Sequence, residues 1–236
     1  MTREFGAHVA SEPASRLQKA RKIAAILGAR CSLRGTRVLD IGTGAGVIAR
    51  YFAALGANVV TCDRQDYVTA GFEAPLLLTD GPDLPFESGA FEVAISNHVI
   101  EHVGERQAQE RHLKEIGRVL SADGILYIAV PNRWTLMEPH YRLPLLSWLP
   151  ATFASLYLRL FGKGDWYDCR PFSATELERL LKRLHFSVES ATIEAFHYYL
   201  EHEASRPLRA LLRRLPVPVI RSLSLVFPTH IFVCRK

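Results

Sequence analysis

The sequence predicts an α/β fold, a doubly wound parallel sheet with helices on both of its faces. Short apolar strands alternate with helical patterns as far as residue 130, which is the rhythm of a parallel sheet. The first strand runs into a glycine-rich turn that opens a helix, and acids follow the next two strands. The chain of 236 residues, 48% of them apolar, has the composition of a globular protein with a sizeable core.

The first half of the chain divides into short elements. Residues 13–30 place apolar side chains at helical spacing, with Gly28 near the end. Apolar runs predict strands over residues 36–41, 58–62, 76–78, 91–96 and 125–130. Two further helices are predicted over residues 47–55 and 105–120. The SADG sequence at residues 121–124 predicts a turn before the fifth strand.

The rhythm changes after Pro131. Residues 132–170 are rich in Pro, Trp, Tyr and Leu, which indicates an insertion and not another strand unit. A helix is predicted over residues 173–184, because Ser173 and Glu176 have the spacing of a capping box. Residues 186–198 have the pattern of a strand, and residues 205–225 carry the arginines. A last strand is predicted over residues 229–234.

The glycine turn at residues 42–46 is the most informative stretch. Glycines are needed where a ligand approaches the backbone or where φ is positive, and here they are Gly42, Gly44 and Gly46. A nicotinamide or flavin fingerprint would need a small residue where Val47 stands. Asp40 would repel a pyrophosphate, so the loop suits a cationic or hydrogen-bond-donating ligand. A tight turn without a ligand is the alternative.

Two further acids stand at strand ends. Asp63 ends the second strand, at the position that holds ribose hydroxyls in doubly wound sheets. Asp80 and Gly81 follow the third strand, where an acid can accept a hydrogen bond from an exocyclic amine such as that of adenine. With Asp40, these acids indicate a nucleoside ligand without phosphates at the carboxyl ends of the strands.

These motifs carry a resemblance to a known family. VLDIGTGAG (38–46), Asp63 and TDGPDLPFESGAFEVAISNHVIEHV (79–103) resemble the class I S-adenosylmethionine-dependent methyltransferases of the small-molecule, type 11-like group. The likeness covers about residues 14–236. It implies a Rossmann-like sheet of seven strands, with the last strand antiparallel between two others and helical insertions forming a lid. It also implies one S-adenosylmethionine at the strand tips.

The resemblance assigns cofactor contacts by position. The glycines form the loop on the methionine side, Asp40 lies beneath it, Asp63 holds the ribose, and Ser96 and Asn97 lie near the sulfonium. Many relatives have Glu where Asp63 stands, and the shorter side chain still reaches the hydroxyls. The implied contacts are Asp40, Gly42, Gly44, Gly46, Asp63, Asp80, Gly81, Ser96 and Asn97.

His98 is the candidate catalytic residue. It follows the fourth strand, where the resemblance implies that the acceptor meets the methyl group. A hydroxyl acceptor benefits from a general base, and imidazole is suited to this role near neutral pH. The alternative is a ring that only packs over the cofactor. The amino-methylating signature, Asn or Asp followed by two prolines, is absent, which counts against amide and nucleobase acceptors.

We expect no metal ion. His98, Glu101 and His102 are nevertheless similar to the ExxEH metal motif of quinone-ring and small-RNA O-methyltransferases, with His for the first Glu, and His140 could be a fourth ligand. That alternative stays open. No two of the cysteines form a CxxC pair, and we expect idle thiols in a reducing cytosol.

We expect a single methyltransferase domain over residues 1–236. Within it, residues 1–35 form an N-terminal helical cap, residues 132–170 an acceptor lid, and residues 203–226 a basic amphipathic insertion. An aromatic, leucine-rich lid implies an acceptor with apolar or ring character, and a lid packed only as core is the alternative.

The net charge of +5 is concentrated in the basic insertion. Five arginines and no acid lie between residues 206 and 221, and without them the remaining 24 basic residues balance the 24 acids. Such a segment suits an anionic membrane surface; a helix covering the sheet edge is the alternative, and nucleic-acid binding is unlikely. The arginines are Arg206, Arg209, Arg213, Arg214 and Arg221.

The function predicted from the sequence is S-adenosylmethionine-dependent O-methylation of a small-molecule or lipid-linked, glycan-like or secondary-metabolite hydroxyl. The alternatives are C- or N-methylation of a quinone, lipid or other small molecule, and a non-catalytic S-adenosylmethionine-binding module. The first residues lack the apolar core of a signal peptide. We therefore expect a cytoplasmic protein, with peripheral association at the inner membrane face as an extension of this prediction.

Overall fold

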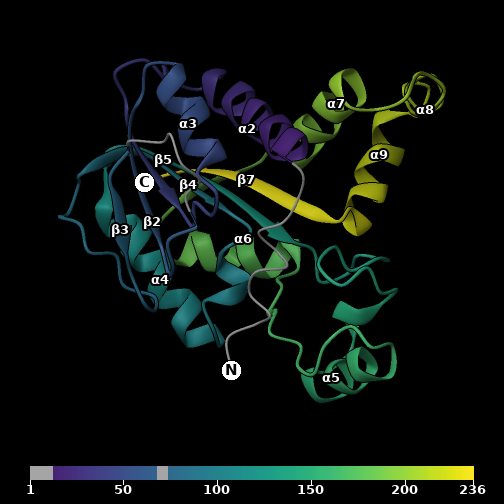
Figure 1. Cartoon of the computed structure of the whole chain (residues 1–236). Helices are drawn as coiled ribbons and strands as arrows, with labels where there is room; N and C mark the ends of the chain where they lie inside the picture. Colours follow the sequence, from purple (N-terminus) through teal and green to yellow (C-terminus); the bar gives the residue numbers. More distant parts are fainter. Residues whose placement is uncertain (1–12, 68–73) are drawn as a thin grey trace.

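The computed structural model describes residues 13–67 and 74–236. Within them, seven strands form one sheet in the order β3-β2-β1-β4-β5-β7-β6 (Figure 1). The strands are β1 (Arg37–Ile41), β2 (Asn58–Asp63), β3 (Leu76–Leu78), β4 (Phe91–Asn97), β5 (Leu120–Pro131), β6 (Ser187–Ser190) and β7 (Thr229–Arg235). The first five pair in parallel, and β7 lies antiparallel between β5 and β6. The predicted Rossmann-like sheet with an antiparallel last strand is confirmed.

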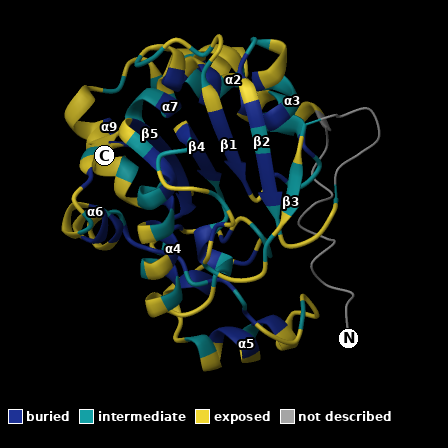
Figure 2. Cartoon of the chain, turned by 90° about the vertical axis from the view of Figure 1, so that its left-hand side faces the viewer, coloured by how far each residue is buried: buried dark blue, intermediate teal, exposed yellow. Residues whose placement is uncertain are grey.

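Helices cover both faces of the sheet (Figure 1). One face carries α2 (Pro13–Gly28), α3 (Val47–Ala54) and α7 (Thr192–His202), and the other carries α4 (Arg106–Val119) and α6 (Ala174–Arg183). Each face has its own buried core, which includes Phe52 and Tyr127 on the first face and Leu113 and Leu177 on the second. Figure 2 shows the central strands as a deeply buried layer between exposed helix surfaces.

The parallel pairing brings several strand ends to one edge. Ile41, the last residue of β1, pairs with Cys62 of β2 and with Ser96 of β4. The glycine turn and Asp63 directly follow Ile41 and Cys62, and His98 stands two residues after Ser96. The register therefore gathers segments that are up to about fifty residues apart in the sequence at the carboxyl edge of the sheet.

The insertion after β5 has a small core of its own. It contains the 3-10 helix η2 (Leu146–Trp148) and α5 (Ala151–Leu160). Leu146, Leu158 and Tyr167 pack together there and are buried. The outer side of α5 is apolar but exposed, and Figure 2 shows α5 away from the main sheet.

The strand predicted over residues 186–198 is wrong beyond residue 190, where α7 follows after one residue. The aromatic and β-branched residues of this segment favour a strand when they are considered alone. Packing decides for a helix, because Thr192 and Ala195 are buried one helical turn apart. Arg30, just after α2, also donates a hydrogen bond to Glu194 at 2.7 Å.

The turn predicted at residues 121–124 is also wrong. These residues form an irregular first part of β5, because the pairing of β5 with β4 shifts register between Phe91 and Val93. Lys236 supports this extended stretch: its backbone N–H donates to the Gly124 carbonyl at 3.1 Å, and its Nζ donates to the Leu120 carbonyl at 2.7 Å. A partner more than 100 residues away cannot be seen in a local pattern.

The arginine-bearing segment forms two short helices, α8 (Arg206–Leu212) and α9 (Val217–Leu223), followed by the 3-10 helix η3 (Ser224–Val226). Pro216 separates the two helices, because it can begin α9 but cannot continue α8. In the described part of the chain, no helix is both long and apolar enough to cross a bilayer. The N-terminal cap is seen as α2, and its residues 1–12 lie outside the described residues.

Candidate active site

A cavity of about 890 Å³ opens at the carboxyl edge of the sheet. Its volume lies in the range of small-molecule sites. Six of the nine predicted cofactor residues and the predicted base His98 line it. The six are Gly42, Gly44, Asp63, Asp80, Gly81 and Asn97. Asp40, Gly46 and Ser96 are not among the lining residues.

The glycine turn takes backbone conformations that require glycine. Gly42, Gly44 and Gly46 have φ of 66°, 54° and 72°, in the left-handed region that other L-residues seldom occupy. A Cβ on Gly42 would also lie 2.5 Å from Val99 Cγ2. The Gly44 N–H donates to Asp63 Oδ2 at 2.8 Å, which holds the loop against the end of β2.

Asp40 lies beneath this loop and is fully buried. Its Oδ2 accepts a hydrogen bond from Thr43 Oγ1 at 2.7 Å. Burial raises the pKa of the Asp40 carboxyl from its ordinary value to about 7, against the opposing effect of the Thr43 hydrogen bond. Asp40 therefore supports the loop from below and does not line the cavity.

The other predicted residues occupy different depths. Asp63 stands at the cavity wall, and its second oxygen accepts the Arg64 N–H at 2.7 Å. Asp80 lies at the rim, where its side chain is 88% exposed and pairs with Arg64 at 3.2 Å. Ser96 is fully buried behind the wall, and its hydroxyl has no hydrogen-bond partner within the described residues.

His98 is held in a strained conformation at the end of β4. Its φ is 59°, which is unusual for a residue with a side chain and typical of functional positions. Its backbone N–H donates to the Ala129 carbonyl at 2.9 Å. Nδ1 lies 3.3 Å from Glu101 Oε1, and Nε2 lies 3.4 Å from Thr229 Oγ1. Burial lowers the pKa of His98, although Glu101 opposes this effect, so the neutral imidazole is favoured at pH 7.

The structure brings together two groups of residues that the sequence did not show to be neighbours. Arg16 and Lys19 of α2 place basic side chains beside the glycine loop. The only signal for them was the basic side of the predicted first helix, which did not show that the helix borders the site. His140 belongs to the second group, which it forms with His102 and Cys169. The sequence offered His102 and His140 as possible metal ligands, but it did not show that Cys169 joins them.

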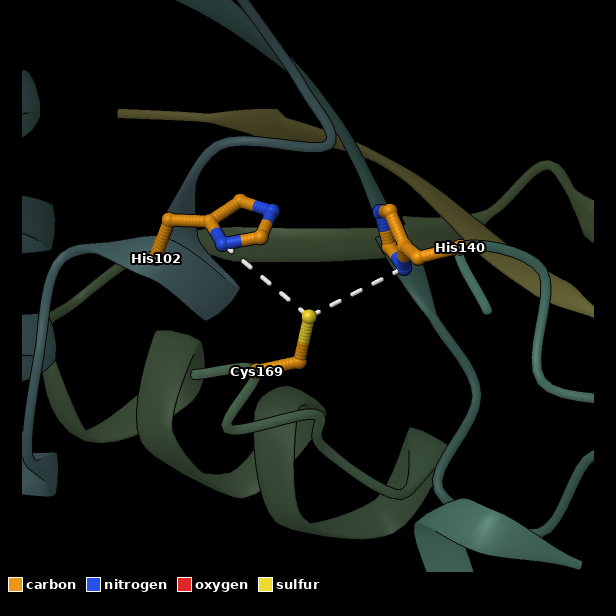
Figure 3. Close-up of side chains that lie close together, drawn as sticks. All are labelled: His102, His140 and Cys169. Atoms are coloured by element: carbon orange, nitrogen blue, oxygen red, sulfur yellow. Dashed lines mark hydrogen bonds between the residues drawn. The ribbon is translucent and has the colours of Figure 1, made fainter. Parts of the chain in front are cut away.

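This second group is a cluster of imidazoles, acids and a thiol. His102 belongs to the 3-10 helix η1 (Ile100–His102), His140 to the insertion after β5, and Cys169 to the loop before α6. Figure 3 shows both imidazoles turned toward Cys169. Glu138 Oε1 lies 2.8 Å from His140 Nδ1, and Asp168 Oδ2 lies 3.6 Å from His102 Nδ1.

Comparisons with known proteins agree with this geometry. Residues 39–128, from β1 into β5, match the methyltransferase domain family. The whole fold is similar to an S-adenosylmethionine-dependent methyltransferase from Mesorhizobium loti, with a TM-score of 0.62 at 14% identity, covering 93% of this chain and 100% of the other. Residues 39–128 thus match a methyltransferase domain, and the chain has the fold of S-adenosylmethionine-dependent methyltransferases.

Other methyltransferases of known structure share the fold. One is the 1,6-didemethyltoxoflavin-N1-methyltransferase of Burkholderia thailandensis, solved with its substrate and S-adenosylhomocysteine. Its TM-score is 0.55 at 20% identity, over 94% of this chain and 78% of that protein.

Curated methyltransferases match over part of their length. A ubiquinone biosynthesis O-methyltransferase of Parvibaculum lavamentivorans is 32% identical over 55% of this chain and 51% of its own length. A glycine/sarcosine/dimethylglycine N-methyltransferase of Actinopolyspora halophila is 34% identical over 41% of this chain and 19% of its own length. The matched region thus spans about half or less of these two methyltransferases.

The residues at this cavity fit S-adenosylmethionine, the cofactor of the methyltransferases that the chain resembles. Gly44 lines the cavity with a positive φ, and because it has no side chain a ligand can approach its backbone. Asp63 offers carboxylate oxygens of the kind that accept from ribose hydroxyls. Arg16 and Lys19 would offer positive charge to the carboxylate of the methionine moiety.

Proposed function

We propose that this protein transfers a methyl group from S-adenosylmethionine to a hydroxyl oxygen of an acceptor with apolar or ring character. The observation that carries the proposal is the imidazole of His98, which faces the same cavity as the glycine loop and has Glu101 behind it. S-adenosylmethionine, when bound, supplies an electrophilic methyl group. The relatives named O-methyltransferases support the choice of oxygen.

His98 acts in this proposal as the general base. Glu101 is fully buried and lies nearer to Nδ1, so it favours the tautomer with the proton on Nδ1. Nε2 is then left with its lone pair and can accept the proton of an acceptor hydroxyl in place of the 3.4 Å contact with Thr229. This arrangement resembles the base and orienting acid of other enzymes that activate a hydroxyl. A positioned base contributes roughly 10²–10⁴-fold to the rate.

The insertion supports an apolar acceptor. Pro139, His140 and Arg142 line the cavity, so the insertion borders the site. Trp134 and Trp148 stack edge to face at 5.4 Å within the same insertion, and both are exposed. Neither tryptophan lines the cavity itself, but exposed aromatic side chains in the insertion that borders it are suited to ring or acyl groups.

We propose in addition that the basic insertion brings this acceptor side to an anionic membrane surface. Asn132 Nδ2 donates to the carbonyls of Leu225 and Phe227 at 2.7 and 2.8 Å, which ties η3 to the start of the insertion after β5. Exposed leucines and valines lie among the arginines of α8, α9 and η3. Apolar burial combined with positive charge is typical of helices that lie at a lipid interface. The exposed apolar residues are Leu208, Leu211, Val217, Val219, Leu223, Leu225 and Val226.

Calorimetric titration and a transfer assay test the function. We expect S-adenosylhomocysteine to bind the full chain and Asp63→Ala to weaken binding at least tenfold, because two ribose hydrogen bonds are lost. Asp123→Ala is the matched control, since Asp123 is an exposed acid that does not line the cavity. With S-adenosylmethionine carrying a ¹³C methyl group and fractionated cell extract, the carbon shift of the product identifies the methylated atom.

Each readout separates one part of the proposal. If the full chain does not bind S-adenosylhomocysteine, the assignment of the cofactor is wrong. If the labelled methyl group appears on nitrogen or carbon, the enzyme is a methyltransferase but not an O-methyltransferase. Binding without transfer to any fraction would favour a non-catalytic module.

A further inference from the structure

Three metal-ligating side chains meet where η1, the insertion after β5 and the loop before α6 come together. Cys169 Sγ lies 4.0 Å from His102 Nδ1 and 3.8 Å from His140 Nδ1 (Figure 3). Ligand atoms of these three residues all lie within 4.8 Å of one another. Cys169 is buried, and both histidines line the large cavity, so the group is closed on one side and open on the other.

These separations are close to those around a tetrahedral ion. Metal–sulfur and metal–nitrogen bonds of about 2.3 and 2.1 Å at the tetrahedral angle separate sulfur and nitrogen by about 3.6 Å. The observed distances of 3.8 and 4.0 Å exceed this value by a few tenths of an ångström. Small side-chain rotations would therefore bring the three atoms onto one ion.

Three carboxylates around this group would be stabilised by a bound cation. Glu101 is 0% exposed and Glu138 is 1% exposed, and Asp168 lies beside them with its side chain 29% exposed. Glu101 Oε1 lies 3.3 Å from His98 Nδ1, and Glu101 Oε2 has no hydrogen-bond partner within the described residues. A buried carboxylate is costly without a balancing positive charge or hydrogen bonds.

We propose that His102, His140 and Cys169 bind one late first-row transition-metal ion of the zinc class. Thiolate and imidazole ligands select such ions over magnesium or calcium. Asp168, whose Oδ1 lies 3.6 Å from Sγ, supplies the fourth ligand. This assignment gives Cys169 a role that its sequence context did not suggest.

Binding would rearrange protons on all three ligands. The thiol of Cys169 loses its proton to solvent, since the thiolate is the ligand. Both imidazoles ligate through an unprotonated Nδ1, so the proton facing Glu138 on His140 and the proton facing Asp168 on His102 are held on Nε2 instead. His140 Nε2 lies 3.9 Å from Glu101 Oε1, so the imidazole can then donate toward the same buried carboxylate that lies against His98 Nδ1. Carboxylates behind ligating histidines are the usual second layer of such sites.

The ion would join three segments that are distant in sequence. It would fasten the insertion after β5 to the end of β4 and to the loop before α6, at the wall of the cavity. This inference does not rest on methyl transfer, and its tests require neither cofactor nor acceptor.

The experiment uses the full chain without a histidine tag, purified without chelators, incubated with ZnCl₂ or CoCl₂ and then desalted. We expect about one metal ion per chain by elemental analysis, as for a closed structural or catalytic site. The cobalt form should show a near-ultraviolet thiolate-to-cobalt absorption band. Cys169→Ser should abolish that band, and His140→Ala should lower the affinity for zinc at least tenfold.

Matched variants control for general damage. Cys31→Ser removes a half-buried thiol in another part of the fold, and His197→Ala removes an exposed imidazole; both should keep the metal and the band. Less than about a tenth of an equivalent in the wild type would overturn the proposal. So would a cobalt band that persists in Cys169→Ser. If Cys169→Ser does not fold, the wild-type protein still tests the proposal, because a cobalt form that lacks the thiolate band would overturn it.

Discussion

Asp40 is a buried acid beneath the glycine turn that makes the stability of the fold depend on pH. Its carboxyl is enclosed beneath the glycine turn, and burial raises its pKa to about 7 from an ordinary value of 3.8. The folded protein therefore keeps a proton between about pH 4 and 7 that the unfolded chain has lost. Stability falls as the pH rises through this window, and the full penalty is present above about pH 7.

Asp40→Asn should remove this penalty. The variant can still accept the Thr43 hydrogen bond through its amide oxygen, and it carries no charge to desolvate. Because one pKa unit corresponds to about 1.4 kcal/mol, we expect a gain of about 2–4 kcal/mol at pH 8 and little gain at pH 4. Urea unfolding at both pH values measures it, with Asp123→Asn as the exposed control. An equal effect at both pH values would contradict the assignment.

His98 is the residue on which the proposed chemistry depends. Replacing it by Gln should lower kcat at least tenfold, because the proton acceptor is lost, while S-adenosylhomocysteine affinity changes little. Wild-type kcat/KM should fall with decreasing pH below about 6.5, since the imidazole with its lowered pKa is protonated only there. His98→Gln should lose this acid limb. Steady-state rates between pH 5 and 8 test it, and an unchanged rate in the variant would exclude His98 as the base.

At the scale of elements, α6 was predicted well because its start is encoded locally. Ser173 Oγ accepts the Glu176 N–H at 3.4 Å, and Glu176 Oε2 accepts the Ser173 N–H at 2.8 Å. The buried side of the helix follows the helical period. The segment at residues 192–202 has no comparable signal, and its helix depends on packing against β7 and α2.

Ser173→Ala should therefore destabilise the protein by about 1 kcal/mol, the usual cost of losing a cap. Ser187, exposed in β6, supplies the control variant Ser187→Ala, which should change stability by less than about 0.5 kcal/mol. Denaturant midpoints measure both. Equal effects of the two substitutions would show that the capping box does not stabilise α6.

At the scale of the whole molecule, the charge distribution decides which partners can approach. The surplus of +5 comes from the arginines of one insertion, and the rest of the chain is balanced. Arg213, Arg214 and Arg221 are exposed there, with Arg213 paired to Glu201 at 3.4 Å on the surface. Such exposed ion pairs contribute little to the stability of the fold, so the arginines stay available to an anionic surface.

Substituting Arg213, Arg214 and Arg221 by Gln should weaken co-sedimentation with phosphatidylserine-containing vesicles roughly 100-fold, at about 1 kcal/mol per arginine. The control substitutes Arg111, Arg179 and Arg183, which remove the same charge from the exposed sides of α4 and α6. Binding should also weaken as salt is raised. If wild-type protein does not sediment with these vesicles, or if both triple variants behave alike, the membrane proposal is wrong.

The sheet, the glycine turn and the acids at the strand ends could be predicted from the amino-acid sequence, because they depend on the local apolar period, on backbone conformations that glycine favours, and on residues next to predicted strands. The sequence could not show that Arg16 and Lys19 border the cavity, since this depends on where α2 packs. Nor could it show that Cys169 meets His102 and His140. Such contacts join segments distant in the chain, and only the tertiary packing of the insertion against the sheet edge brings them within reach.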